Sequence, residues 1–286
     1  MRISRIKGYF ELVTFQHTIF ALPFAYMGMI LGAQGIPAWP VWGWVTVVMV
    51  GARTFGMGMN RLIDHSLDAK NPRTKNRPLP AGRVSRGEVW WLIGVSLLWV
   101  VVGSLNLNRT TLLLSPLILA VMWLYSYLKR FTWMSHFVLG GILGSAPVLG
   151  WLAATGSIGW QPVMLAFAVL FWVAGFDILY ATQDVEFDRK EGLWSIPSLV
   201  GISTALVISR ICHMATFFIL IFLGWILQLG IWYWGALLVI GPILYYQHRI
   251  VSHDDLSRVN RAFFVMNGWV SALLFVATLM DVGLSP

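Results

Sequence analysis

Two groups of carboxylates have a spacing that suits metal and phosphate chemistry. Asn60, Asp64 and Asp68 follow one another at intervals of four residues, and Asp184 and Asp188 repeat that interval. Four residues exceed one helical turn by only about 40°, so each group lies on one helical face. Carboxylates at this spacing repel one another, and a divalent cation relieves the repulsion. Mg²⁺ binds carboxylate oxygens, waters and substrate phosphates, so the pattern predicts a magnesium and diphosphate site.

Basic residues crowd the segment that follows the first group. The stretch NRLIDHSLDAKNPRTKNRPLPAG at 60–82 includes Arg73, Lys75 and Arg77. Lysine and arginine are the natural partners of phosphate oxygens. Pro72 disfavours helical backbone before it and predicts the end of the preceding helix. A single carboxylate pair would be interpreted as ordinary solvated charge beside a membrane. Two pairs, each where a predicted helix leaves the membrane, favour a magnesium and diphosphate site.

Asp177 and Arg53 are charged residues inside long apolar segments. Asp177 lies in FWVAGFDILYATQD, about two turns inside a predicted helix, and Arg53 precedes Asn60 by seven residues. Ionisable residues inside a membrane are costly and indicate functional sites or buried pairs. Asp177 is interpreted as a ligand, a base or the structural partner of an arginine. Arg53 either pairs with Asp177 or binds an anionic group of a substrate.

The composition indicates that these residues are carried by membrane helices. Of the 286 residues, 58% are hydrophobic and only 11% are charged, against about 25% charged in soluble domains. A spanning helix needs about 20 apolar residues, and the first apolar run is long enough to be a retained helix instead of a signal peptide. The sequence predicts an all-α integral membrane protein with nine transmembrane helices, at 12–33, 40–60, 89–106, 111–128, 136–154, 163–182, 201–226, 231–247 and 262–281.

The distribution of basic residues predicts the orientation of this bundle. With a cytoplasmic N-terminus and alternating spans, every Lys and Arg faces the cytoplasm except Arg53, Arg109 and Arg210. Basic residues accumulate in cytoplasmic loops, which explains the net charge of +8 without a nucleic-acid partner. Both acidic groups lie on that same side. We therefore expect the active site on the cytoplasmic face of a bacterial-type inner membrane.

A weak internal repeat suggests two related halves. A long charged loop follows the second predicted helix and another follows the sixth, and each begins with carboxylates four apart. The chain, 1–286, is interpreted as one domain with halves at roughly 1–135 and 136–260 facing a central cavity, and a final helix. Transporters contain such repeats too, so a transporter is the alternative outside the enzymes. Transport sites lie near the bilayer midplane, however, and the polar residues here gather at one face.

These motifs resemble those of the UbiA family of intramembrane aromatic prenyltransferases. The two signatures of that family, NxxxDxxxD and DxxxD, read here as Asn60, Asp64, Asp68, Asp184 and Asp188. Further stretches similar to family sequences are NPRTKNRPLPAG at 71–82, YSYLKR at 125–130 and YATQDVEFDRKEGLWSIP at 180–197. Nine helices also fit, so the resemblance covers essentially the whole chain.

The resemblance implies a helical bundle around a central cavity, Mg²⁺ as cofactor, a polyprenyl diphosphate donor and an aromatic acceptor. The implied metal ligands are Asp64, Asp68, Asp184 and Asp188, and Asn60 would help to organise the same site. The implied contacts to phosphate oxygens are Lys129, Arg73, Lys75 and Arg77. Arg53 and Tyr125 would hold the acceptor, and a carboxylate on that acceptor would suit Arg53 as a bidentate partner. Asp184 or Asp177 would assist at the acceptor hydroxyl.

Two acceptors are compatible with this reaction. Family members that make ubiquinone use 4-hydroxybenzoate, and a related group linked to menaquinone by the futalosine route uses a dihydroxynaphthoate. The segment TFQHTIFALPFAYMG at 14–28 departs from the Lys-Pro-containing form associated with the ubiquinone branch and favours the naphthoate. A sibling enzyme that prenylates a haem precursor or a lipid alcohol is the alternative within the family.

Overall fold

The computed structural model describes residues 2–13 and 18–283, and this part of the chain is helical with no strand. The elements are α1 (Arg2–Val13), α2 (Thr18–Ala33), α3 (Trp39–Ile63), α4 (His65–Lys70), α5 (Arg86–Leu107), α6 (Arg109–Leu128), α7 (Ser135–Thr155), α8 (Trp160–Ala181), η2 (Thr182–Asp184), α9 (Val185–Glu191), α10 (Ile196–Val200), α11 (Ile202–Ile226), α12 (Ile231–Arg249), α13 (Val259–Arg261), η3 (Ala262–Met266), α14 (Asn267–Thr278) and η4 (Leu279–Gly283).

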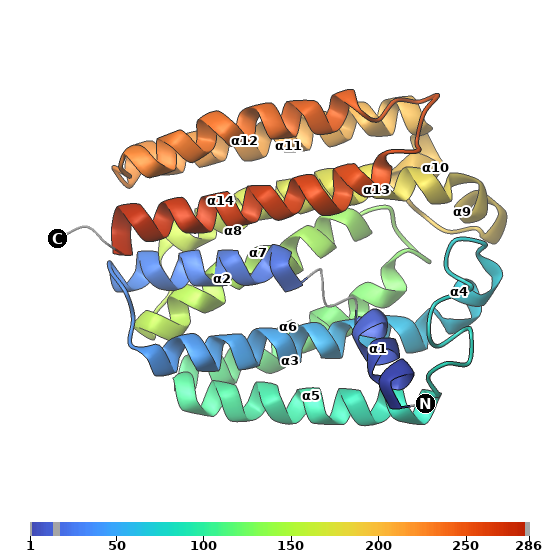
Figure 1. The fold of residues 1–286 in the computed structure, drawn as a ribbon, viewed down its shortest axis with the longest axis horizontal. Coiled ribbons are helices and arrows are strands. Elements are labelled where there is room, and N and C mark those ends of the chain that lie inside the picture. Colours follow the sequence, from blue (N-terminus) through green and yellow to red (C-terminus); the bar gives the residue numbers. More distant parts are fainter. Residues whose placement is uncertain (1, 14–17, 284–286) are drawn as a thin grey trace.

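The axes of the long helices are nearly aligned, and the helices form one bundle, as predicted (Figure 1). The short helices α4, α9 and α10 lie together at one end of the bundle, and α1 lies at that end as well (Figure 1). The last described element, η4, lies at the opposite end (Figure 1). This arrangement brings both predicted acidic groups to the same end, since one lies at the α3–α4 junction and the other at η2 and α9.

The predicted spans coincide with helices wherever the structure describes them. The first prediction, 12–33, is divided because α1 ends at Val13 and α2 begins at Thr18, and residues 14–17 lie outside the described part. Among the described residues, six helices are long and apolar enough to cross a membrane, namely Arg86–Leu107, Arg109–Leu128, Ser135–Thr155, Trp160–Glu191, Ile202–Ile226 and Val259–Gly283. The count of nine spans, the cytoplasmic N-terminus and the relation between two halves stay predictions.

Glycines allow α2 and α7 to pack with their backbones in contact. A Cβ atom added to Gly150 would stand 1.9 Å from the carbonyl oxygen of Ala25, and one added to Gly28 would stand 1.9 Å from that of Pro147. Small residues at such positions permit close helix packing in membranes, where no hydrophobic force drives the helices together. The contact fixes the position of α7, whose first turn carries His136.

A buried aromatic cluster holds α8 against α2 and the C-terminal helices. Trp172 packs edge-on against Phe176, with ring centroids 5.0 Å apart, and lies 5.2 Å from Phe24. Its indole N–H donates to Oδ1 of Asn267 at 3.0 Å, so the buried polar group is satisfied. Because α8 leads directly into η2 and α9, this packing also positions the second acidic group.

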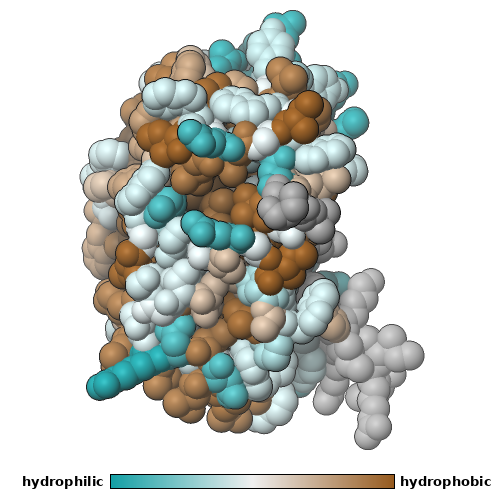
Figure 2. Space-filling model, turned by 90° about the vertical axis from the view of Figure 1, so that its left-hand side faces the viewer, coloured by the Kyte–Doolittle hydropathy of each residue, from teal (hydrophilic) through white to brown (hydrophobic). Residues whose placement is uncertain are grey.

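The two ends of the bundle differ in polarity. The end that carries α4 and α9 holds both acidic groups and the basic loop after α4. Figure 2 shows the opposite end, where the hydrophilic residues are few and lie scattered among apolar and weakly polar ones. The predicted concentration of reactive side chains at one end is therefore present in the structure.

Candidate active site

The first acidic group lies at a break between two helices. α3 ends at Ile63 and α4 begins at His65, with Asp64 between them at φ −90° and ψ 3°. The backbone N–H of Asp64 still donates to the carbonyl oxygen of Asn60 at 2.9 Å, and that of Asp68 donates to Asp64 at 2.7 Å. The helix is thus not continuous through the motif, but its four-residue hydrogen bonding persists, and the three side chains line one cavity.

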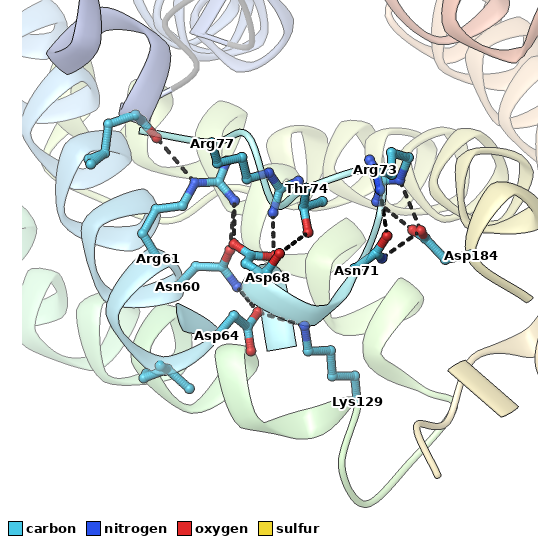
Figure 3. A network of polar contacts seen from close by, with 12 residues as sticks. Asn60, Arg61, Asp64, Asp68, Asn71, Arg73, Thr74, Arg77, Lys129 and Asp184 are labelled. Atoms are coloured by element: carbon cyan, nitrogen blue, oxygen red, sulfur yellow. Dashed lines mark hydrogen bonds and ion pairs between the residues drawn. The ribbon is translucent and has the colours of Figure 1, made fainter. Parts of the chain in front are cut away.

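The basic loop folds back over this break through a series of tight turns. α4 ends at Lys70, and Asn71 adopts an extended backbone with ψ 121°, as the following proline predicts. The backbone N–H of Thr74 then donates to the carbonyl oxygen of Asn71 at 3.0 Å, and that of Arg77 donates to Thr74 at 2.9 Å. These turns bring Arg77 back to Asp68 of the preceding acidic group, whereas Arg73 reaches Asp184 of the second group (Figure 3).

Asp64 is held by three donors. The ammonium of Lys129 lies 2.6 Å from Oδ2, and the side-chain amide of Asn60 donates to the same oxygen at 2.9 Å. Arg130 donates to Oδ1 at 3.0 Å. The carboxylate is only 2% exposed, so it needs these charged partners, and the two cations leave a positive excess beside it.

Asp68 lies beside one cation from the loop after α4 and one from α3. Arg77 donates to Oδ1 at 2.7 Å, and a guanidinium nitrogen of Arg61 lies 3.8 Å from Oδ2. The hydroxyl of Thr74 donates to the backbone carbonyl of Asp68 at 3.0 Å. Arg61 also donates to the carbonyl oxygen of Leu12 at 3.3 Å, which ties α1 to the site. Figure 3 shows these side chains converging on Asp68.

Asp184, in the second acidic group, is bonded to the basic loop of the first. Arg73 donates from Nε to Oδ1 at 2.9 Å and from a terminal nitrogen to Oδ2, which makes a bidentate pair, and Asn71 donates to Oδ1 at 2.9 Å. Arg73 also donates to the hydroxyl of Tyr180 at 2.9 Å. Burial disfavours the charged guanidinium, but the hydrogen bonds and the charge of Asp184 outweigh that cost and raise the pKa of Arg73 above its ordinary value.

Asp188 is positioned by the loop that precedes α10. Ser195 donates its hydroxyl to Oδ2 of Asp188 at 2.7 Å and caps α10 by accepting a hydrogen bond from the backbone N–H of Ser198. The backbone N–H of Trp194 donates to the carbonyl oxygen of Lys129 at 2.7 Å. The second acidic group is therefore connected to the α6–α7 loop, which supplies the cations on Asp64.

Asp177 pairs with a histidine. Its Oδ2 lies 2.7 Å from Nδ1 of His136, and the Nε2 atom of His136 accepts a hydrogen bond from the backbone N–H of Ile196 at 3.3 Å. With Nε2 as acceptor, a neutral His136 carries its proton on Nδ1 and donates it to Asp177. The alternative that Asp177 pairs with Arg53 is wrong in this structure.

These side chains line two adjoining cavities. The polar one has a volume of about 220 Å³, and its wall includes all four carboxylates proposed as metal ligands. The apolar one has a volume of about 230 Å³, and its wall includes Met49, Met122 and Leu139. The two cavities adjoin because six residues line both, namely Asn60, Arg61, Arg77, Tyr125, Asp177 and Tyr180.

The sequence-predicted binding residues divide between the two cavities and the surface. Arg53 lines the apolar cavity, and its buried Nε has no hydrogen-bond partner among the residues described. Tyr125 lines both cavities. The wall of the polar cavity includes Lys129, Arg73 and Arg77. Lys75 is exposed and absent from that wall, so its contact with phosphate stays a prediction that the structure does not support.

Several residues of the site were not singled out from the sequence. Arg61 and Arg130 are the direct neighbours of the predicted Asn60 and Lys129, and adjacency alone was a usable signal. His136 was missed although it is an ionisable residue at the start of an apolar segment, which is the same signal that identified Asp177. Its role depends on α7 packing beside α8, which no local pattern contains.

The carboxylates suit Mg²⁺ that is shared with a substrate more than a closed protein cage. Within residues 2–13 and 18–283 there is no cluster of three His, Cys, Asp or Glu side chains able to hold a metal alone. Mg²⁺ in phosphate sites commonly takes one or two carboxylates and completes its shell with water and phosphate oxygens. Oδ2 of Asp68 is buried and accepts no hydrogen bond in the described structure, and its charged neighbour Arg61 lies 3.8 Å away, so this oxygen has a lone pair available for a metal ion. The donor set therefore fits this ion.

The sequence matches known proteins over most of its length. A sequence profile of the UbiA prenyltransferase family matches residues 21–270. A 4-hydroxybenzoate octaprenyltransferase of Salmonella paratyphi B is 31% identical over 242 residues, which cover 83% of each chain. A profile match of this extent assigns the family.

Solved structures agree with that assignment. The apo structure of a UbiA homolog from Aeropyrum pernix K1 has a TM-score of 0.85 and 33% identity, covering 93% of this chain and 98% of that one. A UbiA homolog from Archaeoglobus fulgidus bound to GPP and Mg²⁺ has a TM-score of 0.73 at 19% identity, covering 96% and 99%, and shows a shared fold. Together with the six membrane-length helices and the two signatures, these matches establish that the chain is an integral membrane prenyltransferase of the UbiA family.

Proposed function

We propose that this enzyme transfers a polyprenyl group from a polyprenyl diphosphate to a hydroxylated aromatic carboxylate in respiratory quinone biosynthesis. The observation that carries the proposal is the junction of the two cavities. One is lined by carboxylates and cations that suit a diphosphate with its metal. The other is largely apolar and contains the guanidinium of Arg53, whose buried Nε has no hydrogen-bond partner among the described residues. A substrate with a charged leaving group and an apolar chain, and a second substrate with a carboxylate, fit such a pair of cavities.

The diphosphate is assigned to the polar cavity. Lys129, Arg73 and Arg77 lie in its wall, and each is already bonded to a carboxylate. Arginine binds phosphate oxygens in a bidentate manner, and lysine supplies a compact point charge. The phosphate oxygens would therefore compete for the donors that now bind the aspartates. This competition would free the carboxylates for a metal ion.

Mg²⁺ is assigned to the same cavity, with Asp64, Asp68, Asp184 and Asp188 as ligands and Asn60 as a support for Asp64. The Archaeoglobus fulgidus homolog of this fold is bound to GPP and Mg²⁺, which supports the assignment. When bound, the ion neutralises part of the charge on the diphosphate. Of the protein's own ligands, Asp64 and Asp184 already have fixed orientations, because Asn60 and Asn71 each donate an amide N–H to one of them.

The acceptor is assigned to the apolar cavity, with its carboxylate on Arg53. A buried guanidinium without an anionic partner is costly, and an acceptor carboxylate would satisfy its donors in bidentate geometry. Tyr125 lines the junction and would orient the ring toward the donor. The apolar walls exclude water, which protects an allylic cation from hydrolysis.

In the reaction, the allylic C–O bond breaks and its electron pair leaves with the diphosphate, while a ring carbon forms a bond to the allylic carbon. The cationic side chains stabilise the leaving charge. A base then takes the proton from the attacked carbon, and its C–H electron pair restores the aromatic ring. Asp177 is assigned to the acceptor hydroxyl because it lines both cavities, whereas Asp184 lines only the polar one and is held there by Arg73.

For the topology we propose nine spanning helices with a cytoplasmic N-terminus and the active site at the cytoplasmic face of a bacterial-type inner membrane. The proposal is supported by the position of α1, α4 and α9 at one end of the bundle (Figure 1). It is also supported by the positive-inside distribution of Lys and Arg in the sequence.

The identity of the acceptor is tested by direct comparison of two substrates. Membranes containing the enzyme are given Mg²⁺ and a radiolabelled polyprenyl diphosphate, with either 4-hydroxybenzoate or 1,4-dihydroxy-6-naphthoate. The relative from Salmonella paratyphi B is a 4-hydroxybenzoate octaprenyltransferase, whereas the first apolar segment favours the naphthoate. Prenylation of either ring supports the proposed acceptor class and decides between the two. Turnover of neither, with transfer to a haem precursor or a lipid alcohol, would refute it.

A further inference from the structure

A third cavity lies outside the site described above. It has a volume of about 760 Å³ and lies between α11 and α12, which Figure 1 shows side by side at the edge of the bundle. No residue of its wall belongs to either cavity of the candidate active site. Its size is within the range of about 300–1,000 Å³ that is usual for ligand sites. It is therefore large enough to hold a ligand of its own.

The long wall of this cavity is apolar and open to the surroundings of the bundle. Met214 is 57% exposed, Phe218 is 62% exposed and Tyr245 is 67% exposed. The ring of Phe217 forms part of the floor and lies against Gly241, where an added Cβ atom would stand 3.1 Å from it. Met214 and Phe218 lie on α11, which is long and apolar enough to cross a membrane. Exposed apolar side chains on such a helix face lipid, so this wall suits acyl chains.

The polar end of the cavity carries two arginines on facing helices. Arg210 belongs to the third turn of α11, and Arg249 is the last residue of α12. Both side chains are exposed, and neither has an ion pair among the described residues. The nearby acidic residue Asp254 pairs instead with its neighbour His253 at 3.0 Å. Two unpaired guanidinium groups at one end of an apolar groove complement a single phosphate group.

A buried histidine pair forms the inner wall between these arginines and α8. Nδ1 of His213 lies 2.8 Å from Nε2 of His248, and Nε2 of His213 lies 3.2 Å from the carbonyl oxygen of Trp172. The ring of His213 packs directly against Gly175, where a Cβ atom would stand 2.4 Å from it. Because Nε2 of His213 donates to the Trp172 carbonyl, its Nδ1 accepts from Nε2 of His248, and Nδ1 of His248 is left buried without a hydrogen-bond partner among the described residues. The permanent positive charges in the cavity wall are those of Arg210 and Arg249.

We propose that this cavity binds one anionic glycerophospholipid, with its phosphate between Arg210 and Arg249 and an acyl chain along Met214, Phe218 and Tyr245. A free phosphate would leave the apolar wall uncovered, and a zwitterionic lipid would leave the two guanidinium groups without net compensation. The arginines lie toward the end of the bundle that carries the basic loops, where anionic lipids of the inner leaflet are attracted. The proposal does not depend on the acceptor or the donor assigned above.

Binding is measured by native mass spectrometry of the detergent-solubilised full-length enzyme, with dioleoylphosphatidylglycerol or dioleoylphosphatidylcholine added. We compare the wild type with the double variant R210Q/R249Q and with R86Q/R109Q, which removes the same charge from exposed arginines elsewhere. We expect at least a tenfold loss of phosphatidylglycerol binding in R210Q/R249Q, no such loss in R86Q/R109Q, and no selective binding of phosphatidylcholine.

Competition by inorganic phosphate and a comparison of thermal stability complete the test. Inorganic phosphate in excess should not displace the bound phosphatidylglycerol, and displacement would instead indicate a simple anion site and overturn the proposal. Equal phosphatidylglycerol binding by the wild type and R210Q/R249Q would also overturn it. Because R210Q/R249Q alters exposed side chains, its thermal unfolding midpoint without added lipid should match that of R86Q/R109Q, and a loss of lipid binding then reports the site itself.

Discussion

Arg73 binds both carboxylate oxygens of Asp184, and this bidentate pair joins two loops that are 111 residues apart in the sequence. It connects the basic loop after α4 to the second acidic group, so the two signatures of the family meet across one polar cavity. A second ion pair, Lys70 with Glu191 at 2.7 Å, joins the same two regions, but neither residue is in the cavity wall. We therefore propose that the Arg73–Asp184 pair contributes to catalysis. The Lys70–Glu191 pair only holds the two loops together.

This difference predicts the effect of replacing each cation. Arg73→Lys keeps the positive charge but cannot bind Asp184 in a bidentate manner. A hydrogen bond to a charged group contributes about 1.5–3 kcal/mol. We expect prenyl transfer to fall by about 10- to 100-fold in kcat/KM for the diphosphate. Lys70→Ala, the matched control, should change it little because exposed ion pairs contribute at most about 1 kcal/mol. An equal loss in both variants would show that the Arg73 pair only holds the loops.

A second comparison concerns two basic residues of the same loop. Arg77 donates to Asp68 in the polar cavity, whereas Lys75 is exposed and outside its wall. Arg77→Ala removes a charge from the phosphate site and leaves the Asp68 carboxylate with a weaker partner, so we expect a fall of at least tenfold in kcat/KM for the diphosphate. Lys75→Ala should lower it much less. Steady-state kinetics at fixed acceptor concentration check this, and a larger effect of Lys75→Ala would restore the role that the sequence predicted for it.

The spacing of carboxylates in the sequence was sufficient to predict the acidic part of the site. Asn60, Asp64 and Asp68 share one cavity wall, as intervals of four residues require, even though the helix is interrupted at Asp64. The interruption was not predicted, because no proline or glycine occurs at that position to indicate it. The end of α4 before Pro72 was predicted because proline acts on the residue before it through local sterics.

Partners in distant parts of the chain could not be read from the sequence. Asp177 pairs with His136 instead of Arg53 because Gly140 and Gly144 let the backbone of α7 pack directly against α8, which places His136 beside Asp177. Periodicity gives the face of a helix but not which neighbouring helix covers it. The helical segments were predicted well, since they depend on apolar runs that continue for whole spans.

The hydrogen bond between His136 and Asp177 predicts a positioning effect on turnover. His136→Ala removes the donor that orients Asp177, and we expect kcat to fall by about tenfold, which corresponds to about 1.4 kcal/mol and is close to the lower limit for a hydrogen bond to a charged group. His136→Asn retains a side-chain N–H and should recover part of the rate. The KM for the diphosphate should change little in both. Equal kcat in the alanine variant and the wild type would remove Asp177 from the reaction.

The unpaired guanidinium of Arg53 predicts selective loss of acceptor binding. Arg53→Leu deletes the partner of the acceptor carboxylate, and we expect the KM for the acceptor to rise by at least tenfold while that for the diphosphate changes little. Arg53→Lys keeps the charge but cannot bind a carboxylate in a bidentate manner, so its KM for the acceptor should lie between those of the wild type and Arg53→Leu. Initial rates with each substrate varied in turn separate the two constants. A rise confined to the diphosphate constant would place Arg53 in the donor site and contradict the proposed arrangement.

The central claim is that the two acidic groups hold Mg²⁺ and the diphosphate together. The most direct measurement is prenyl transfer in membranes stripped of divalent ions with chelator, while Mg²⁺ is added back to the wild type, Asp64→Ala and Asp184→Ala. The account predicts that the wild type loses activity on chelation and regains it with Mg²⁺. Both variants should stay at least 100-fold less active at all Mg²⁺ concentrations. Full activity of the wild type without divalent ions, or of either variant, would contradict it.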